Sequence, residues 1–166
     1  MEITLTPIEQ ELARRIAVLR NEVNRSRGHP INVRRPQDHT KNDIDGMGAE
    51  LAVARALNVY PDLDVVDAQA EDLLFHGYSI DVKQTHHPKG KLLLGFEKTK
   101  FCDFYCLVTG EMPTYEIVGF ASLGKLRHPD SVINLGYGNT YGLDQDKLAS
   151  LDLFVNTVRE LRGIEI

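Results

Sequence analysis

Two aspartates and a lysine lie on a short hairpin that the sequence predicts around His76-Gly77. Glycine accepts the positive φ that a two-residue turn requires, and strand-forming residues flank this one on both sides. In the resulting register Asp72 faces Asp81 across the ladder. Lys83 follows Asp81 by two residues and points to the same face of its strand. The hairpin is therefore predicted to gather two carboxylates and one ammonium group on one face.

This combination of groups suits a divalent cation. Two carboxylates directly opposite each other lie about 5 Å apart and repel each other. A cation between them turns that repulsion into ligation, and hard oxygen ligands are typical of Mg²⁺ or Mn²⁺ sites. The Lys83 ammonium group can then meet negative charge that develops beside the ion. The alternative is an edge hairpin with a solvated acidic face, in which Lys83 only pairs with Asp81 or Asp72.

A third carboxylate belongs to a predicted helix that begins near residue 43 or 45 and ends at residue 57. The buried stripe of this helix is expected to comprise Met47, Leu51 and Ala54. Glu50 falls inside that stripe, where an unpaired carboxylate costs several kcal/mol. We therefore expect Glu50 either to reach the metal site or to pair with an arginine, such as Arg55 or one from the basic segment before the helix.

These residues resemble the signature of the PD-(D/E)XK nuclease superfamily, in which an acidic residue precedes an (Asp/Glu)-X-Lys motif. Here Asp72 is followed, after the hairpin, by Asp81-Val82-Lys83. The segment G-M-G-A-E-L-A-V-A-R-A-L around Glu50 also resembles the first helix of these nucleases, whose glutamate points at the metal. Glu71 stands where the family carries proline, and it is a rival ligand that strand alternation aims at the core. The resemblance covers about residues 46 to 121.

The resemblance implies an α/β fold with a restriction-endonuclease-like core, a central mixed β-sheet flanked by helices. It implies a Mg²⁺-dependent deoxyribonuclease that hydrolyses phosphodiester bonds as an endonuclease or resolvase, with Mn²⁺ able to substitute. Glu50, Asp72 and Asp81 would hold the metal, and Lys83 would complete the catalytic group. The small size and the lack of a recognition domain also resemble phage-encoded nucleases.

The length of 166 residues predicts one domain, residues 1–166, whose N-terminal helix and basic arm occupy residues 1–42. A net charge of −5 argues against a protein that coats nucleic acid through bulk charge, but it allows a local basic groove. The sequence has no apolar run of membrane-spanning length and no signal-peptide pattern. We therefore expect a cytoplasmic protein, in the host cytoplasm if viral, with no membrane partner.

Basic residues on both sides of the hairpin predict contacts to a DNA backbone. The segment from residue 25 to 41 is expected to be a loop with an excess of basic residues, and a solvated linker is the alternative. Thr85 continues the face of Asp81 and Lys83, and a basic loop follows it. The predicted nucleic-acid contacts are Arg25, Arg27, Arg34, Arg35, Thr85, Lys89 and Lys91.

The remaining elements are predicted from caps and periodicity. A helix begins at Pro7, with Thr6 and Glu9 forming a capping box. Its apolar stripe comprises Ile8, Leu12, Ile16, Leu19 and Val23, and it packs on the domain or on a second copy in a homodimer. Further strands are expected near residues 65–66, 92–94, 104–109 and 115–121, and a last helix is expected to start at Asp146 or Ser150. Cys102 and Cys106 are expected on one face of a strand, as core thiols.

Two other functions stay open. One is a non-catalytic nucleic-acid-binding protein on a nuclease fold. The other is a viral interaction protein that uses the acidic hairpin against a host protein.

Overall fold

The computed structural model describes residues 1–27, 39–66, 71–136 and 138–164. Five strands form a mixed sheet in the order β1-β6-β5-β3-β2, and three form a smaller sheet in the order β4-β8-β7. The strands are β1 (Glu2–Thr4), β2 (Leu73–Phe75), β3 (Tyr78–Thr85), β4 (Leu92–Gly95), β5 (Phe104–Glu111), β6 (Thr114–Ser122), β7 (Val132–Asn134) and β8 (Asn139–Leu143). In the larger sheet β3 and β5 are parallel, and the other neighbours are antiparallel.

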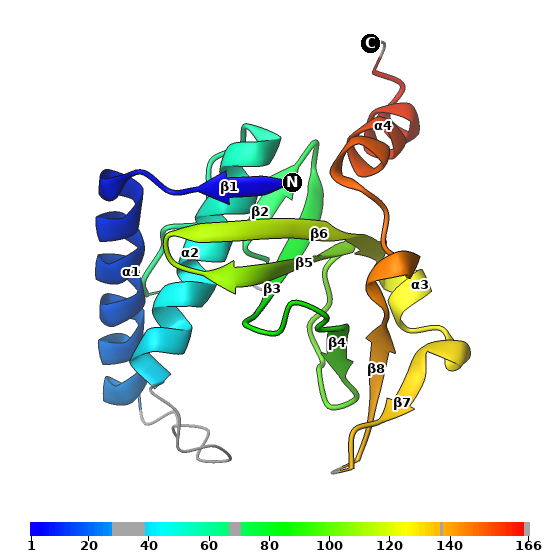
Figure 1. Cartoon of the computed structure of the whole chain (residues 1–166), viewed down its shortest axis with the longest axis horizontal. Coiled ribbons are helices and arrows are strands. Elements are labelled where there is room, and N and C mark those ends of the chain that lie inside the picture. Colours follow the sequence, from blue (N-terminus) through cyan, green and yellow to red (C-terminus); the bar gives the residue numbers. More distant parts are fainter. Residues whose placement is uncertain (28–38, 67–70, 137, 165–166) are drawn as a thin grey trace.

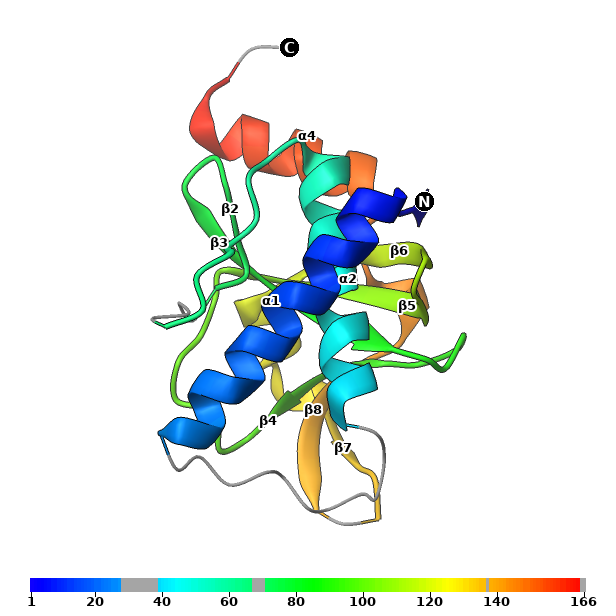
Figure 2. The same ribbon diagram turned by 90° about the vertical axis from the view of Figure 1, so that its left-hand side faces the viewer.

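Helices cover the larger sheet. The helices are α1 (Pro7–Ser26), α2 (His39–Leu57), α3 (Leu123–Leu126) and α4 (Leu151–Arg162). Helix α2 lies between α1 and the sheet, as Figures 1 and 2 show, and it contacts β3, β5 and β6. The expected α/β architecture, a mixed sheet with flanking helices, is therefore confirmed.

The alternation of side chains along β5 divides the interior into two cores. Cys106 and Val108 face the larger core, which α1, α2 and α4 cover. Tyr105 and Leu107 face a second core beneath β4, β8 and α3. Because successive strand residues point to opposite faces, β5 is buried on both sides. Cys102 precedes β5 and packs in the second core, so the prediction that both cysteines share one strand face is wrong.

The N-terminal helix begins as predicted. The Thr6 side chain accepts a hydrogen bond from the Glu9 amide, and the Glu9 side chain accepts one from the Thr6 amide. The predicted apolar stripe is only partly correct, because Ile8 is 82% exposed and Leu19 is 45% exposed. The fully buried positions are Ala13 and Ala17, whose small side chains allow α1 to approach α2 closely.

The hairpin also forms as predicted. His76 and Gly77 both have positive φ, 48° and 83°, as a tight turn between twisted strands requires. Leu73 pairs with Ile80, which is the predicted register. Strand β2 begins at Leu73, so Asp72 lies directly before the ladder, where its amide donates to the Ile80 carbonyl.

Three boundaries differ from the predictions. Helix α1 continues to Ser26 and α2 begins at His39, so Arg25 and Lys41 are helical and not part of a loop. Val65 and Val66 lie in irregular backbone and do not form a strand. The last helix does begin after Ser150, which caps it. Within the described ranges, every helix is too short or too polar to cross a lipid bilayer.

Candidate metal and catalytic site

Asp81 lies at the centre of the predicted site, on β3. Its side chain is buried, with the residue only 5% exposed. Lys98 donates a hydrogen bond to Oδ1 across 2.8 Å, and Lys83 forms an ion pair with Oδ2. Both carboxylate oxygens therefore face a lysine ammonium group, and a metal bound to Asp81 would have to displace at least one of them.

Asp72 lies beside Asp81, at the start of β2. One of its carboxylate oxygens accepts a hydrogen bond from the Val82 amide at 2.6 Å, which fixes the side chain against β3. Burial raises the pKa of Asp72 to about 6 against the effect of that hydrogen bond, and the negative charge of Asp81 adds to the rise. The repulsion between the two aspartates that the sequence predicted is therefore present.

Glu50 approaches the same site from α2. Its side chain is 14% exposed and belongs to the buried face of the helix, as predicted. The pKa of Glu50 is raised to about 8. Burial is the main cause and the Asp72 charge adds to the rise, whereas the Arg20 guanidinium acts to lower it. Asp72 thus interacts with Glu50 on one side and with Asp81 on the other.

The three carboxylates do not form a closed cage. Among the described residues, Glu50, Asp72 and Asp81 do not bring one oxygen each to within 4.8 Å of one another. An ion between them would therefore be held by some protein oxygens and complete its shell with other ligands. Mg²⁺ commonly binds in this way, through one or two carboxylates, several waters and substrate phosphates.

Arg20 is a residue of the candidate site that the sequence did not reveal. The guanidinium donates to Glu50 Oε2 at 3.2 Å and to the carbonyl oxygens of Asp62 and Asp64 at 2.8 and 3.0 Å. Glu50 therefore does pair with an arginine, as the alternative to a metal-site role predicted, but its partner is Arg20, whereas Arg55 pairs with Glu9. In the sequence Arg20 belongs to the polar side of α1, and only the packing of α1 on α2 brings it to Glu50.

The residues present fit a divalent cation. Burial and repulsion between neighbouring carboxylates raise the pKa values of Glu50 and Asp72, and a bound cation would favour their ionised forms. Asp81 adds a third carboxylate, whose oxygens pair with Lys83 and Lys98 when no metal is bound. Carboxylate oxygens are the hard donors that Mg²⁺ and Mn²⁺ prefer.

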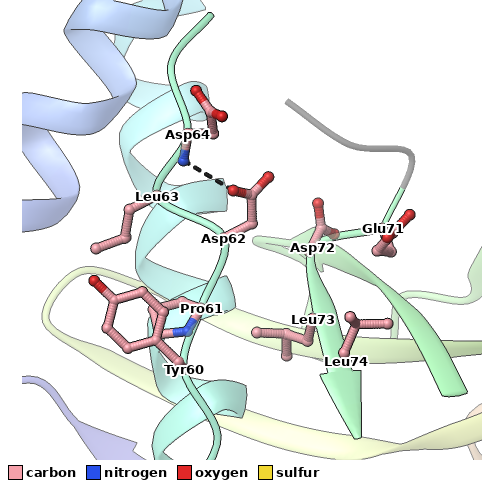
Figure 3. A pocket seen from close by; sticks show the side chains of 9 residues that line it. All are labelled: Tyr60, Pro61, Asp62, Leu63, Asp64, Glu71, Asp72, Leu73 and Leu74. Atoms are coloured by element: carbon pink, nitrogen blue, oxygen red, sulfur yellow. Dashed lines mark hydrogen bonds between the residues drawn. The ribbon is translucent and has the colours of Figure 1, made fainter. Parts of the chain in front are cut away.

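A pocket of about 510 Å³ opens beside Asp72. Its walls are the segments 60–64 and 71–74. A hydrogen bond of 3.1 Å from the Asp62 amide to the Asp72 carbonyl joins the two segments. Figure 3 shows the Asp62 and Asp72 carboxylates on these two facing segments, where Tyr60 and Leu73 also line the pocket. Glu71, the rival ligand, lines the same pocket. Asp72 therefore forms part of the wall of this pocket.

A second group of possible ligands lies around Asp45 of α2. Asp45, His86 and Glu111 bring one ligand atom each to within 4.8 Å of one another. However, the Lys41 ammonium group pairs with both Asp45 and Glu111, and His86 Nε2 lies 2.9 Å from Asp45. A metal here would have to displace Lys41. Lys41 therefore already balances the negative charges of Asp45 and Glu111. The four residues form an ion-pair network that connects the end of β3 and the β5–β6 turn to α2.

The predicted nucleic-acid contacts are dispersed. Thr85 ends β3, and Lys89 is exposed in the loop that follows. Lys91 pairs with Asp144, so its positive charge is already partly balanced and less available to a phosphate. Arg25 is exposed on α1, and Arg27 donates to the Val66 carbonyl at 2.6 Å. Arg34 and Arg35 lie outside the described residues.

Comparisons of the chain with protein-family models, curated proteins and solved structures find no match. The chemistry of the site therefore carries the functional inference.

Proposed function

We propose that the chain is a metal-dependent nuclease of the PD-(D/E)XK type, which hydrolyses phosphodiester bonds in DNA. One observation supports this above all. Asp72, Asp81 and Lys83 share one hairpin, and Glu50 of α2 is close enough to Asp72 for their charges to interact. The arrangement of α2 against β3, within a mixed sheet, is also what a restriction-endonuclease-like core would require.

Each residue has a role in this proposal. Glu50, Asp72 and Asp81 would hold the cation, and Arg20 positions Glu50 through its hydrogen bond. A bound Mg²⁺ or Mn²⁺ ion would polarise the scissile phosphate and acidify the attacking water. The Lys83 ammonium group stabilises negative charge on the phosphoryl oxygens as the bond breaks.

The basic loop after β3 gives the substrate a direction of approach. Thr85 lies two residues beyond Lys83 on the same strand, and the exposed Lys89 follows. Phosphates next to the scissile one can bind these residues, while the reacting phosphate sits at Lys83. Phosphate contacts of this kind fix position without reading sequence.

The test is a cleavage assay on linear, nicked and branched DNA with Mg²⁺, Mn²⁺ or EDTA. We expect cleavage with either metal and none with EDTA. Asp81→Asn and Lys83→Met should each lower the rate by about 100-fold or more, as loss of a metal ligand or charge-stabilising group does. Asp45→Asn, which alters the other group of possible ligands, should retain most activity.

Two results would contradict the proposal. Metal-independent cutting would remove the role of the carboxylates, and full activity after Asp81→Asn together with Lys83→Met would remove the site itself. Salt-sensitive DNA binding without any cleavage would instead support the non-catalytic nucleic-acid-binding alternative.

A further inference from the structure

Two lysines from different parts of the chain share the carboxylate of Asp81. Lys83 is its neighbour on β3 and pairs with Oδ2. Lys98 comes from the connection between β4 and β5, and its Nζ lies 2.8 Å from Oδ1. Each carboxylate oxygen therefore faces an ammonium group. Only Lys83 belongs to the sequence motif, and the motif gives Lys98 no role.

The surroundings of Lys98 hold its ammonium group in place. The Lys98 amide donates to the Gly95 carbonyl at 3.3 Å, which fixes the turn after β4. Its Nζ lies 5.6 Å from the centroid of the Tyr105 ring. Tyr105 is fully buried and pairs with Asp81 across the parallel strands. Lys98 is thus placed by a turn, an aromatic face and a carboxylate.

A metal bound through Oδ1 of Asp81 would have to displace the Lys98 ammonium group. A lysine ammonium is a point charge on a flexible stem, so it can leave one oxygen for another at little steric cost. The nearest new acceptors in a nuclease complex are the oxygens of the substrate phosphate. Lys98 therefore has one partner in the free protein and another available in the complex.

We propose that Lys98 competes with the metal for Asp81 and, in the complex with nucleic acid, releases Oδ1 to bind a substrate phosphate oxygen. This inference rests on the proposed nuclease function. It makes Lys98 a further substrate-contacting residue and couples two binding events. Because nucleic acid draws Lys98 away from Asp81, it tightens metal binding, and by linkage the metal tightens nucleic-acid binding by the same factor.

The test measures Mn²⁺ binding by the electron paramagnetic resonance signal of free Mn²⁺. The proteins are wild type, Lys98→Met, Lys98→Gln and the control Lys100→Met, which removes the same charge from an exposed position of the same connection. We expect both Lys98 variants to bind Mn²⁺ about tenfold more tightly than wild type, because the competing ammonium group is gone. Lys100→Met should stay within about twofold of wild type.

A second titration adds a hydrolysis-resistant phosphorothioate duplex to wild type and Lys98→Met. The duplex should tighten Mn²⁺ binding several-fold in wild type and much less in Lys98→Met. This arm uses the unaltered protein, so it stands even if the variants fold poorly. Absence of coupling in wild type overturns the inference.

The outcomes separate this inference from the proposed function. If wild type binds no Mn²⁺, the proposed metal-dependent function fails. If wild type binds Mn²⁺ and folded Lys98 variants bind it equally or more weakly, the competition by Lys98 is wrong while the nuclease proposal stands.

Discussion

Arg20 of α1 and Glu50 of α2 join two helices at the candidate site, through a hydrogen bond of 3.2 Å between Nη1 and Oε2. The same guanidinium donates to the carbonyl oxygens of Asp62 and Asp64, on the segment that forms one wall of the pocket. One side chain therefore connects α1, α2 and the pocket wall. It also supplies the positive charge that favours an ionised Glu50.

Replacing Arg20 with methionine should destabilise the metal-free protein, and more so at high pH. At pH 8.5 the ionised Glu50 would lose its cation, at a cost of about 1–3 kcal/mol. At pH 5.5 Glu50 is protonated, because its pKa is about 8, and the cost should be smaller. Urea unfolding at both pH values measures the difference. Arg15→Met, an exposed control on the same helix, should change little, and an equal cost at both pH values for Arg20→Met would argue against charge pairing.

Replacing Glu50 with glutamine should stabilise the metal-free protein at high pH. The folded-state pKa of about 8 lies above the usual 4.5, so the protonated Glu50 contributes its full stabilisation below pH 4.5. This stabilisation is lost as the pH rises through the folded-state pKa of about 8. Glu50→Gln removes this loss, and we expect a gain of about 1–3 kcal/mol at pH 8.5 with little change at pH 4.5. Urea unfolding across this range measures the effect, with the exposed Glu22→Gln as control.

Metal affinity should rise with pH. Carboxylates must lose their protons before they bind a metal, and the pKa values of Asp72 and Glu50 are about 6 and about 8. We expect the Mn²⁺ association constant to increase by more than about tenfold between pH 6 and pH 8. Calorimetric titration measures it. An affinity that does not vary over this range would place the ion elsewhere.

Two glycines on α2 should respond oppositely to alanine. A Cβ at Gly48 would lie 2.1 Å from the hydroxyl oxygen and 2.8 Å from Cζ of Tyr115, which is fully buried. Gly48→Ala should therefore destabilise the protein by about 1–3 kcal/mol through overpacking. A Cβ at Gly46 would meet no atom within 4 Å, so Gly46→Ala should stabilise the helix by about 0.5–1 kcal/mol. Thermal unfolding of both variants measures the contrast.

Local chemistry allowed several elements to be predicted from the sequence. The hairpin follows from glycine after His76, and the start of α1 follows from Thr6 and Glu9. The inward direction of Glu50 follows from helical periodicity. Each of these depends on residues within a few positions of one another, where propensity and periodicity are informative.

The contacts that complete the site could not be predicted in this way. Arg20 and Glu50 are 30 residues apart, and Lys98 and Asp81 are 17 apart. Both pairs depend on how separate elements pack. The prediction of the buried face of α1 was partly wrong for a similar reason. Close packing on α2 buries the small residues Ala13 and Ala17, and Ile8 is exposed.

The most direct measurement is a crystal structure of the protein soaked with Mn²⁺, with the ion located by anomalous scattering. We predict an anomalous peak ligated by Asp72 and Asp81, with Glu50 as a direct ligand or bound through water. Lys98 should have left Oδ1 of Asp81 if a phosphate or nucleic acid is also bound. A fully occupied peak only among Asp45, His86 and Glu111, with none at Asp81, would contradict the proposed catalytic site.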